Sequence, residues 1–291
     1  MTVMTYVIHG ATGAQGAPVV SALATAGKPV VALTRNPDAV VPGARVAAID
    51  YSSTNDLTQL YREATGVFVH LPIAAEGDRR TYAGNIVAAV RAARPARVVF
   101  STSGFALDTA GSREQDNPDR SAVMTLFDGL ADSGVSYAAI APELFLENLL
   151  MPHVVTPVRE DGVLSYPLSA DFAVSWASHL DIADVAVALF ERPDVTGVVS
   201  VGQYPAITGH DLAEAFAARF GRHVTYETMT PEALQTALAP MIGDGPAADV
   251  ADGYRAMAAL PDRAIAPERS AQKLLGVTPR TPSQWLADLG L

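Results

Sequence analysis

The sequence predicts an α/β protein: a doubly wound parallel sheet with helices on both faces, followed by a smaller, mostly helical part. Two observations lead to this prediction. Across residues 5–101, short apolar runs rich in β-branched residues alternate with amphipathic stretches, which is typical of parallel strands joined by crossover helices. Beyond residue 150 this alternation gives way to short strands and several helices. The chain has 291 residues, enough for one large domain or two small ones.

The expected elements follow from apolar periodicity and from capping residues. Strands of the main sheet are expected at residues 6–8, 29–33, 45–49, 66–71, 96–100, 135–141 and 197–201. Helices are expected from residue 16, at 54–64, 78–93 and about 119–132, and after Asp181, which we expect to be an N-cap. In the later part, strands are expected at 162–166, 172–176 and 223–227, and helices at 208–220, from 231, and at 247–260, 268–275 and 282–289.

A glycine-rich turn follows the first strand, with Gly10, Gly13 and Gly16 spaced three apart before an apolar-periodic helix. Gly10 lets the chain leave the strand sharply, Gly13 leaves room for a ligand beside the backbone, and Gly16 lets the helix approach the sheet. The helix N-terminus offers free N–H groups and a partial positive charge to a pyrophosphate. We therefore predict dinucleotide binding rather than a glycine-rich turn without a ligand. The binding residues would be Gly10, Thr12, Gly13, Ala14, Gln15 and Gly16.

The spacing Gly-x-x-Gly-x-x-Gly, with Gly10-Ala11-Thr12-Gly13 at the end of a strand, resembles the atypical short-chain dehydrogenase/reductase superfamily. Within it the chain is similar to the NmrA-like family, which holds NADPH-dependent quinone and triphenylmethane-dye reductases and redox-sensing regulators that bind the cofactor without turnover. The resemblance implies a Rossmann-type NAD(P)-binding domain over residues 1–150, with return segments near 175–201. A smaller substrate-binding domain over 151–291 would pack over the carboxyl ends of the strands and close a cleft.

The composition narrows the possible partners. A net charge of −11, from 20 basic and 31 acidic residues, argues against binding to nucleic acid or to an anionic membrane. The sequence has no cysteine, which excludes disulfides, zinc thiolate sites and a cysteine nucleophile. The six histidines are scattered, so we expect no metal site. Without a signal-peptide pattern or a long apolar run, we expect a cytoplasmic protein, either a monomer or a homodimer.

The end of the second strand reads Thr34-Arg35-Asn36-Pro37, where a site specific for NAD would carry a carboxylate to accept from the ribose 2′-OH. Arg35 instead offers a planar, permanently charged fork that suits a 2′-phosphate. We therefore predict NADP (NADPH) as the cofactor, with a solvated surface arginine as the alternative. The resemblance also implies that Asp50, next to Tyr51, meets the adenine amino group, although a turn-capping aspartate fits the sequence equally well.

Two further turns follow the fourth and fifth strands. In the family the first of them, His70-Leu71-Pro72, runs along the ribose and pyrophosphate mainly through its backbone. The imidazole of His70 is a candidate catalytic group, but a hydrogen-bonded packing residue is the favoured interpretation. Ser101 and Thr102 should face the nicotinamide. The hydroxyl of Ser103 is in a position to orient a substrate carbonyl, unless this turn only satisfies its own backbone.

The substrate site is expected after the sixth strand. The stretch from Pro142 to Asn148 is similar to a Pro-x-x-Phe-x-x-Asn segment of the family, at the floor of the substrate cleft. The resemblance implies that Phe145 and Asn148 line the pocket, and we expect Pro142 and Trp176 to add apolar surface to it. A core phenylalanine and a capping asparagine are the alternative.

The Tyr-x-x-x-Lys pair that most short-chain dehydrogenases use as acid and base is absent from the sequence. The helix expected at about 119–132 has neither tyrosine nor lysine, which argues against ordinary alcohol–ketone chemistry. The first hypothesis is an NADPH-dependent oxidoreductase acting on a quinone or another flat conjugated or aromatic acceptor, with Ser103 or Asn148 as a neutral hydrogen-bond donor. The others are a regulator that senses NADP without catalysis and an enzyme that tailors aromatic natural products.

Overall fold

The computed structural model describes residues 5–62, 64–105, 107 and 121–291, and the chain forms two compact units. The first unit contains Met1–Pro142, His179–Val201 and Glu268–Val277. The second contains Glu143–Ser178, Gly202–Pro267 and Thr278–Leu291. Each unit is therefore assembled from segments that are far apart in the sequence.

The first unit is built on a seven-stranded parallel sheet with the order β10-β6-β5-β4-β1-β2-β3. Its strands are β1 (Thr5–Ile8), β2 (Val30–Thr34), β3 (Arg45–Ala48), β4 (Ala64–Val69), β5 (Arg97–Ser101), β6 (Ser136–Pro142) and β10 (Gly197–Val201). From β1 the chain builds the sheet first in one direction, to β2 and β3, and then in the other, from β4 outward. This is the doubly wound Rossmann-like α/β arrangement that the sequence predicted.

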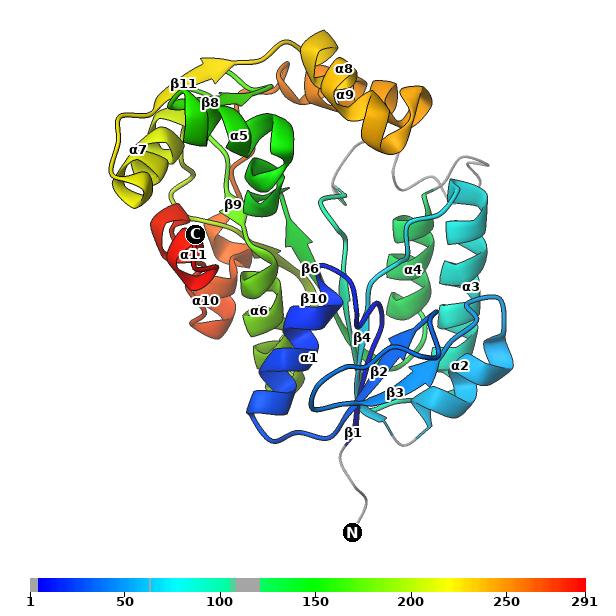
Figure 1. Ribbon diagram of the computed structural model, residues 1–291. Helices are drawn as coiled ribbons and strands as arrows, with labels where there is room; N and C mark the ends of the chain where they lie inside the picture. Colours follow the sequence, from blue (N-terminus) through cyan, green and yellow to red (C-terminus); the bar gives the residue numbers. More distant parts are fainter. Residues whose placement is uncertain (1–4, 63, 106, 108–120) are drawn as a thin grey trace. The chain divides into compact units, whose positions relative to one another are not determined.

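Helices cover both faces of this sheet (Figure 1). One face carries α1 (Gly16–Thr25) and α6 (His179–Glu191), and the other carries α2 (Thr54–Tyr61), α3 (Glu76–Ala93) and α4 (Ala122–Ala131). The inner strands β2 and β5 are buried on both faces, which explains why they read as continuous apolar runs rather than as alternating patterns. The short helix α10 (Ala271–Leu275) lies against β10 and α6.

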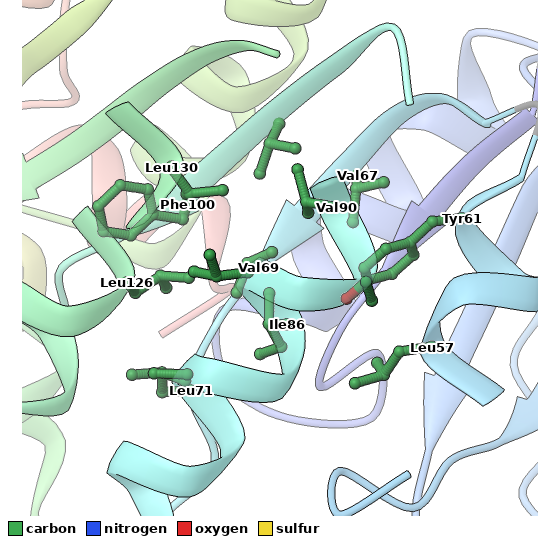
Figure 2. Close-up of a cluster of buried hydrophobic side chains, with 14 of the residues drawn as sticks. Leu57, Tyr61, Val67, Val69, Leu71, Ile86, Val90, Phe100, Leu126 and Leu130 are labelled. Atoms are coloured by element: carbon green, nitrogen blue, oxygen red, sulfur yellow. The ribbon is translucent and has the colours of Figure 1, made fainter. Parts of the chain in front are cut away.

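The larger core of the first unit lies between the sheet and the face formed by α2, α3 and α4 (Figure 2). Val67, Val69 and Phe100 project from the strands, and Leu57, Tyr61, Ile86, Val90, Leu126 and Leu130 meet them from the helices. The three helices thus bury one apolar face each, as their periodicity predicted. This packing fixes the carboxyl ends of the strands, where a ligand of such a sheet binds.

Helix α1 packs against the first strand through Gly16. A Cβ atom on Gly16 would lie 2.2 Å from the carbonyl oxygen of Gly10 and 2.5 Å from that of His9. Such contacts do not occur between real atoms, so only glycine permits this approach of the helix to the strand end. The close-packing role predicted for Gly16 is therefore confirmed.

The second unit combines helices with two short parallel sheets. One sheet pairs β8 (Val163–Tyr166) with β11 (Thr225–Thr228), and the other pairs β7 (Leu144–Phe145) with β9 (Trp176–Ala177). Its helices are α5 (Pro152–Glu160), α7 (Gly209–Phe220), α8 (Pro231–Ile242), α9 (Asp244–Met257) and α11 (Pro282–Asp288), with short 3₁₀ turns at Leu146–Leu150 and Pro267–Arg269. Capping boxes start α7 at Thr208 and α11 at Thr281, and Thr230 caps α8 before Pro231.

Some elements differ from the sequence prediction. Asp181 is not an N-cap, because α6 already begins at His179 and places Asp181 in its first turn, where it is buried. The strand expected at 172–176 is also wrong: Val174 forms only isolated bridges to Ile207 and Arg263, and pairing continues only at β9. Helix α5 was not predicted, although Pro152 suits the first position of a helix. The start of the helix expected at about 119–132 lies outside the described residues, which resume at residue 121.

Candidate functional site

The candidate site lies in the first unit, where the order of the strands reverses between β1 and β4. A cavity of about 380 Å³ opens beside the turns that follow β1, β2 and β4. It is lined by Gly10, Thr12, Gly13, Ala14, Leu33, Thr34, Arg35, Asn36, Tyr51, His70, Pro72 and Ile73. Eight of these twelve residues are among those that the sequence predicted to bind a cofactor.

The glycine turn forms one wall of the cavity. Gly10 has a φ of +58°, and the N–H of Gly13 donates to the Gly10 carbonyl at 2.8 Å, which closes the turn. Helix α1 follows at once, with Gln15 at its N-cap position. The side chain of Gln15 makes no capping hydrogen bond to the backbone at this end of the helix. At the start of α1 the N–H of Ala17 donates to the Gly13 carbonyl at 3.0 Å and Pro18 has no N–H, so Gly16 is the helical residue whose N–H can meet an anion beside the turn.

Arg35 lies at the mouth of the cavity, directly after β2. Its side chain is exposed, and Asn36 beside it is held by a hydrogen bond from its N–H to the hydroxyl of Thr34 at 3.2 Å. The charge of the Arg35 guanidinium lowers the pKa of the Tyr51 phenol, against the larger, opposite effect of burial. Arg35 is therefore part of the pocket wall rather than a remote surface arginine.

Tyr51 connects the pocket to the turn. Burial raises the pKa of Tyr51 to about 12, partly offset by the charge of Arg35 and by a hydrogen bond from the Gly10 backbone. The preceding Asp50 is exposed. Its Oδ1 accepts two hydrogen bonds from Ser52, one from the N–H at 2.8 Å and one from the hydroxyl at 2.7 Å. These two hydrogen bonds lower the pKa of the Asp50 carboxyl. Asp50 thus caps a turn beside the pocket, and its second oxygen is left for another partner.

Two neutral histidines flank Gly10. His9 is fully buried, and its Nε2 lies 2.6 Å from the hydroxyl of Tyr61. Burial, with a smaller effect from His70, lowers the pKa of His9 to about 3. His70 lines the cavity, and a Cβ on Gly10 would lie 3.5 Å from its Nδ1. Burial, with smaller effects from His179 and Arg79, lowers the pKa of His70 to about 4.

Stability should fall as the pH falls from 7 to 5. His9, His70 and His179 have folded-state pKa values of about 3, 4 and 4, below their ordinary 6.5, so the unfolded chain binds more protons between these values. The stabilisation is complete above pH 6.5 and is lost as the pH falls toward 4, by up to about 1.4 kcal/mol per pH unit for each histidine. The measurement is the free energy of unfolding by urea at pH 5, 6 and 7. His9→Asn should flatten this slope, and the exposed His210→Asn should leave it unchanged; a flat slope in the unmodified protein would contradict the assignment.

The turn after β5 belongs to the same unit. Ser101 and Thr102 are buried, and the N–H of Ser103 donates to the hydroxyl of Ser101 at 3.2 Å. Ser103 has a φ of +57°, a left-handed conformation that is uncommon for serine. The amide nitrogen of Gln15 donates to the Ser103 hydroxyl at 3.3 Å. Two predicted site residues from different turns are thereby brought together.

The residues predicted for the substrate pocket have different surroundings. Pro142 is buried at the end of β6, where it pairs with Val201 of β10. In the second unit, Phe145 and Asn148 are half-buried, and the Asn148 amide donates to the hydroxyl of Tyr166 at 3.4 Å. Trp176 has only 2% of its surface exposed, so the expectation that it offers surface to a ligand is wrong. Its ring packs edge-on against Tyr166 in the core of the unit.

Sequence reasoning missed some residues of the cavity. Leu33, Thr34 and Asn36 line it beside Arg35, and Ile73 follows Pro72 with 92% of its surface exposed. All four are neighbours of predicted residues, so treating each turn as a whole would have identified them. The buried hydrogen bond between His9 and Tyr61 could not be predicted from neighbouring residues, because it joins residues that are 52 positions apart.

Comparisons of the sequence add to this geometry. A model of the NmrA-like family matches residues 3–259. The chain is 28% identical over 285 residues to the NAD(P)H azoreductase of Xenophilus azovorans, which covers 94% of each chain. It is also 28% identical over 236 residues, 79% of each chain, to the (4-alkanoyl-5-oxo-2,5-dihydrofuran-3-yl)methyl phosphate reductase of Streptomyces griseus.

Solved structures share the fold over nearly the whole chain. The triphenylmethane reductase of Citrobacter sp., complexed with NADP(H), superimposes with a TM-score of 0.78 at 18% identity and covers 99% of this chain and 100% of its own. The NADPH-dependent quinone oxidoreductase of Escherichia coli, complexed with NADPH, has a TM-score of 0.75 at 22% identity and the same coverage. Across the described residues, no helix has the length and apolar character needed to span a bilayer.

Proposed function

The chain belongs to the NmrA-like family, and from this membership and the geometry of its site we propose that it is an NADPH-dependent oxidoreductase acting on a flat conjugated acceptor such as a quinone. The cavity beside the glycine turn would hold the dinucleotide. The pyrophosphate would lie against the turn and the N-terminus of α1, and the 2′-phosphate beside Arg35.

One observation carries this proposal: the glycine turn and Arg35 line the same cavity. Among the described residues that line it, none is an aspartate or glutamate that would accept from a ribose 2′-OH. The azoreductase is named for NAD(P)H, and the two solved structures described above are complexes with NADPH and with NADP(H). These relatives support the same cofactor here. The direct test is titration of the protein with NADPH, followed by turnover with 2-methyl-1,4-naphthoquinone.

The acceptor is proposed from what the relatives have in common. Azo compounds, quinones and triphenylmethane dyes are all conjugated. Hydride transfer to a quinone gives a delocalised phenolate, and hydride transfer to a cationic triphenylmethane dye gives a neutral product. Such an acceptor depends less on an acid positioned beside it than a simple ketone does. This matches a chain whose helix α4 has neither tyrosine nor lysine between Ala122 and Ala131. During turnover, hydride would pass from the nicotinamide to the acceptor, and a proton from water would complete the reduction.

A second candidate is a regulator that binds NADPH without turnover. The observation that favours it is the same absence of the Tyr-x-x-x-Lys pair from the sequence. The two candidates differ in one result: tight binding of NADPH with no oxidation of it by any quinone, azo or triphenylmethane acceptor would support the regulator. An aromatic tailoring enzyme, the third possibility, would instead accept a polycyclic aromatic ketone at a comparable rate.

We expect NADPH to bind roughly 10- to 100-fold more tightly than NADH. Charge-assisted hydrogen bonds from Arg35 to the 2′-phosphate are worth about 1.5–3 kcal/mol, and about 1.4 kcal/mol is tenfold in affinity. Calorimetric titration with both cofactors measures the preference directly. Arg35→Ala should remove most of it and leave the affinity for NADH nearly unchanged. The control is Arg91→Ala, which removes an equal charge from an exposed position on α3. Equal affinities of the unmodified protein for NADPH and NADH would refute the assignment of Arg35.

A further inference from the structure

The amide of Gln15 has unsatisfied hydrogen-bonding capacity in a buried place. Gln15 has 5% of its surface exposed, and its nitrogen donates to the Ser103 hydroxyl. Its buried Oε1 has no partner within the described part of the chain. If the amide is turned over, the nitrogen is left in that position instead, so one end of the group lacks a partner in either orientation. A buried polar atom without a partner costs free energy, and a hydrogen bond to a ligand is one way to offset that cost.

The position of this amide points to one end of the dinucleotide. Gln15 stands at the N-cap of α1, within the glycine turn, and its hydrogen bond to Ser103 carries the side chain to the turn after β5. The cavity beside Arg35 lies at the turns after β1, β2 and β4. A dinucleotide that enters this cavity with its phosphate-bearing adenosine end has its nicotinamide end directed toward the turn after β5.

We propose that the side-chain amide of Gln15 recognises the primary carboxamide of the bound nicotinamide. The Oε1 atom accepts a hydrogen bond from the carboxamide NH₂, while Ser103 holds the other end of the Gln15 amide. A primary carboxamide suits this position because it supplies the donor that Oε1 lacks and is planar like its partner. This pairing limits rotation of the nicotinamide ring, and Gln15 thereby acts as a positioning residue for the ring. The inference rests on the proposed function for the identity of the cofactor.

The test compares three ligands on the whole protein by calorimetry. NADP⁺ has the carboxamide, 3-acetylpyridine adenine dinucleotide phosphate replaces its NH₂ by a methyl group, and 2′-phospho-ADP-ribose has no nicotinamide. The unmodified protein should bind NADP⁺ roughly 2- to 10-fold more tightly than the acetyl analogue, as expected for one hydrogen bond. Gln15→Met should reduce this ratio to about one. Its affinity for 2′-phospho-ADP-ribose should stay within about twofold of the original.

The control is Gln203→Met in the second unit. Gln203 is also a buried glutamine, 8% exposed, with its nitrogen bonded to the Arg280 carbonyl at 2.7 Å and a buried Oε1 without a partner within the described part of the chain. Its replacement should leave the ratio intact even if stability falls. An unchanged ratio in a folded Gln15→Met variant would overturn the inference, as would equal affinities of the unmodified protein for NADP⁺ and the acetyl analogue. Failure of all three ligands to bind would instead refute the proposed function.

Discussion

Gly13→Val is expected to abolish NADPH binding while the protein stays folded. Gly13 lies in the wall of the cavity and is exposed, and its φ is in the ordinary negative range. A Cβ there would lie 3.2 Å from the Gly10 carbonyl, a tight contact that a small shift relieves. The two γ-methyl groups of valine would then occupy space where the pyrophosphate approaches the backbone. We expect an affinity loss of at least roughly 100-fold, since both the phosphate contacts and the fit to the helix N-terminus are lost.

Two further variants separate binding from folding. Gly84→Val on α3 is the matched control, because Gly84 is exposed and a Cβ there has no atom within 4 Å among the described residues. It should change neither binding nor the melting temperature appreciably. Gly16→Ala should instead destabilise the fold, since its Cβ would overlap the Gly10 carbonyl at 2.2 Å. Unchanged NADPH affinity in a folded Gly13→Val variant would mean that the glycine turn has only a structural role.

Much of the fold was predictable because its signals are local. The glycine turn, the β-branched runs and the caps at Thr208 and Thr230 each lie within a few residues of the structure that they determine. The doubly wound sheet then follows from alternation of strand and helix, since parallel strands need crossover connections. The site residues were predicted by the same logic, because the carboxyl ends of parallel strands lie at one edge of the sheet, where a ligand binds.

The remaining features depend on contacts between distant residues. Val174 forms isolated bridges to residues 207 and 263, which are distant in the sequence. The sequence around Val174 therefore does not show that its pairing stops at single bridges. Trp176 reads equally well as a pocket or a core residue, and its burial is decided by the second unit as a whole. Asp181 was misplaced for a local reason, since a helix boundary set by one capping residue is uncertain by one or two residues, and α6 begins two residues earlier. The hydrogen bond of Gln15 to Ser103 spans 88 positions and left no trace in either segment.

The chain should oxidise NADPH with small quinones at least roughly 100-fold faster than with aliphatic ketones. Reduction of a simple ketone creates an alkoxide that needs a proton as it forms, and loss of a positioned acid typically costs about 10²–10⁴-fold. The sequence lacks the Tyr-x-x-x-Lys pair that would supply this proton, and the ring nitrogens of His9 and His70 are neutral at pH 7. A quinone instead takes the hydride as a delocalised phenolate, which leaves the site charged or gains its proton from water. Correct positioning of the two rings then supplies much of the rate.

The measurement is the initial rate of NADPH oxidation with 2-methyl-1,4-naphthoquinone and with cyclohexanone, in the unmodified protein and in four variants. Tyr51→Phe and His70→Gln change the phenol and the imidazole that line the cavity, and Tyr166→Phe and Tyr254→Phe change the paired hydroxyls beside Asn148. Burial raises the pKa of Tyr166 and of Tyr254, so neither is poised to give up a proton near neutrality. Each variant should keep its quinone rate within about tenfold, less than a true general acid would cost. Efficient ketone reduction that disappears in one variant would identify that residue as an acid and reverse this account of the mechanism.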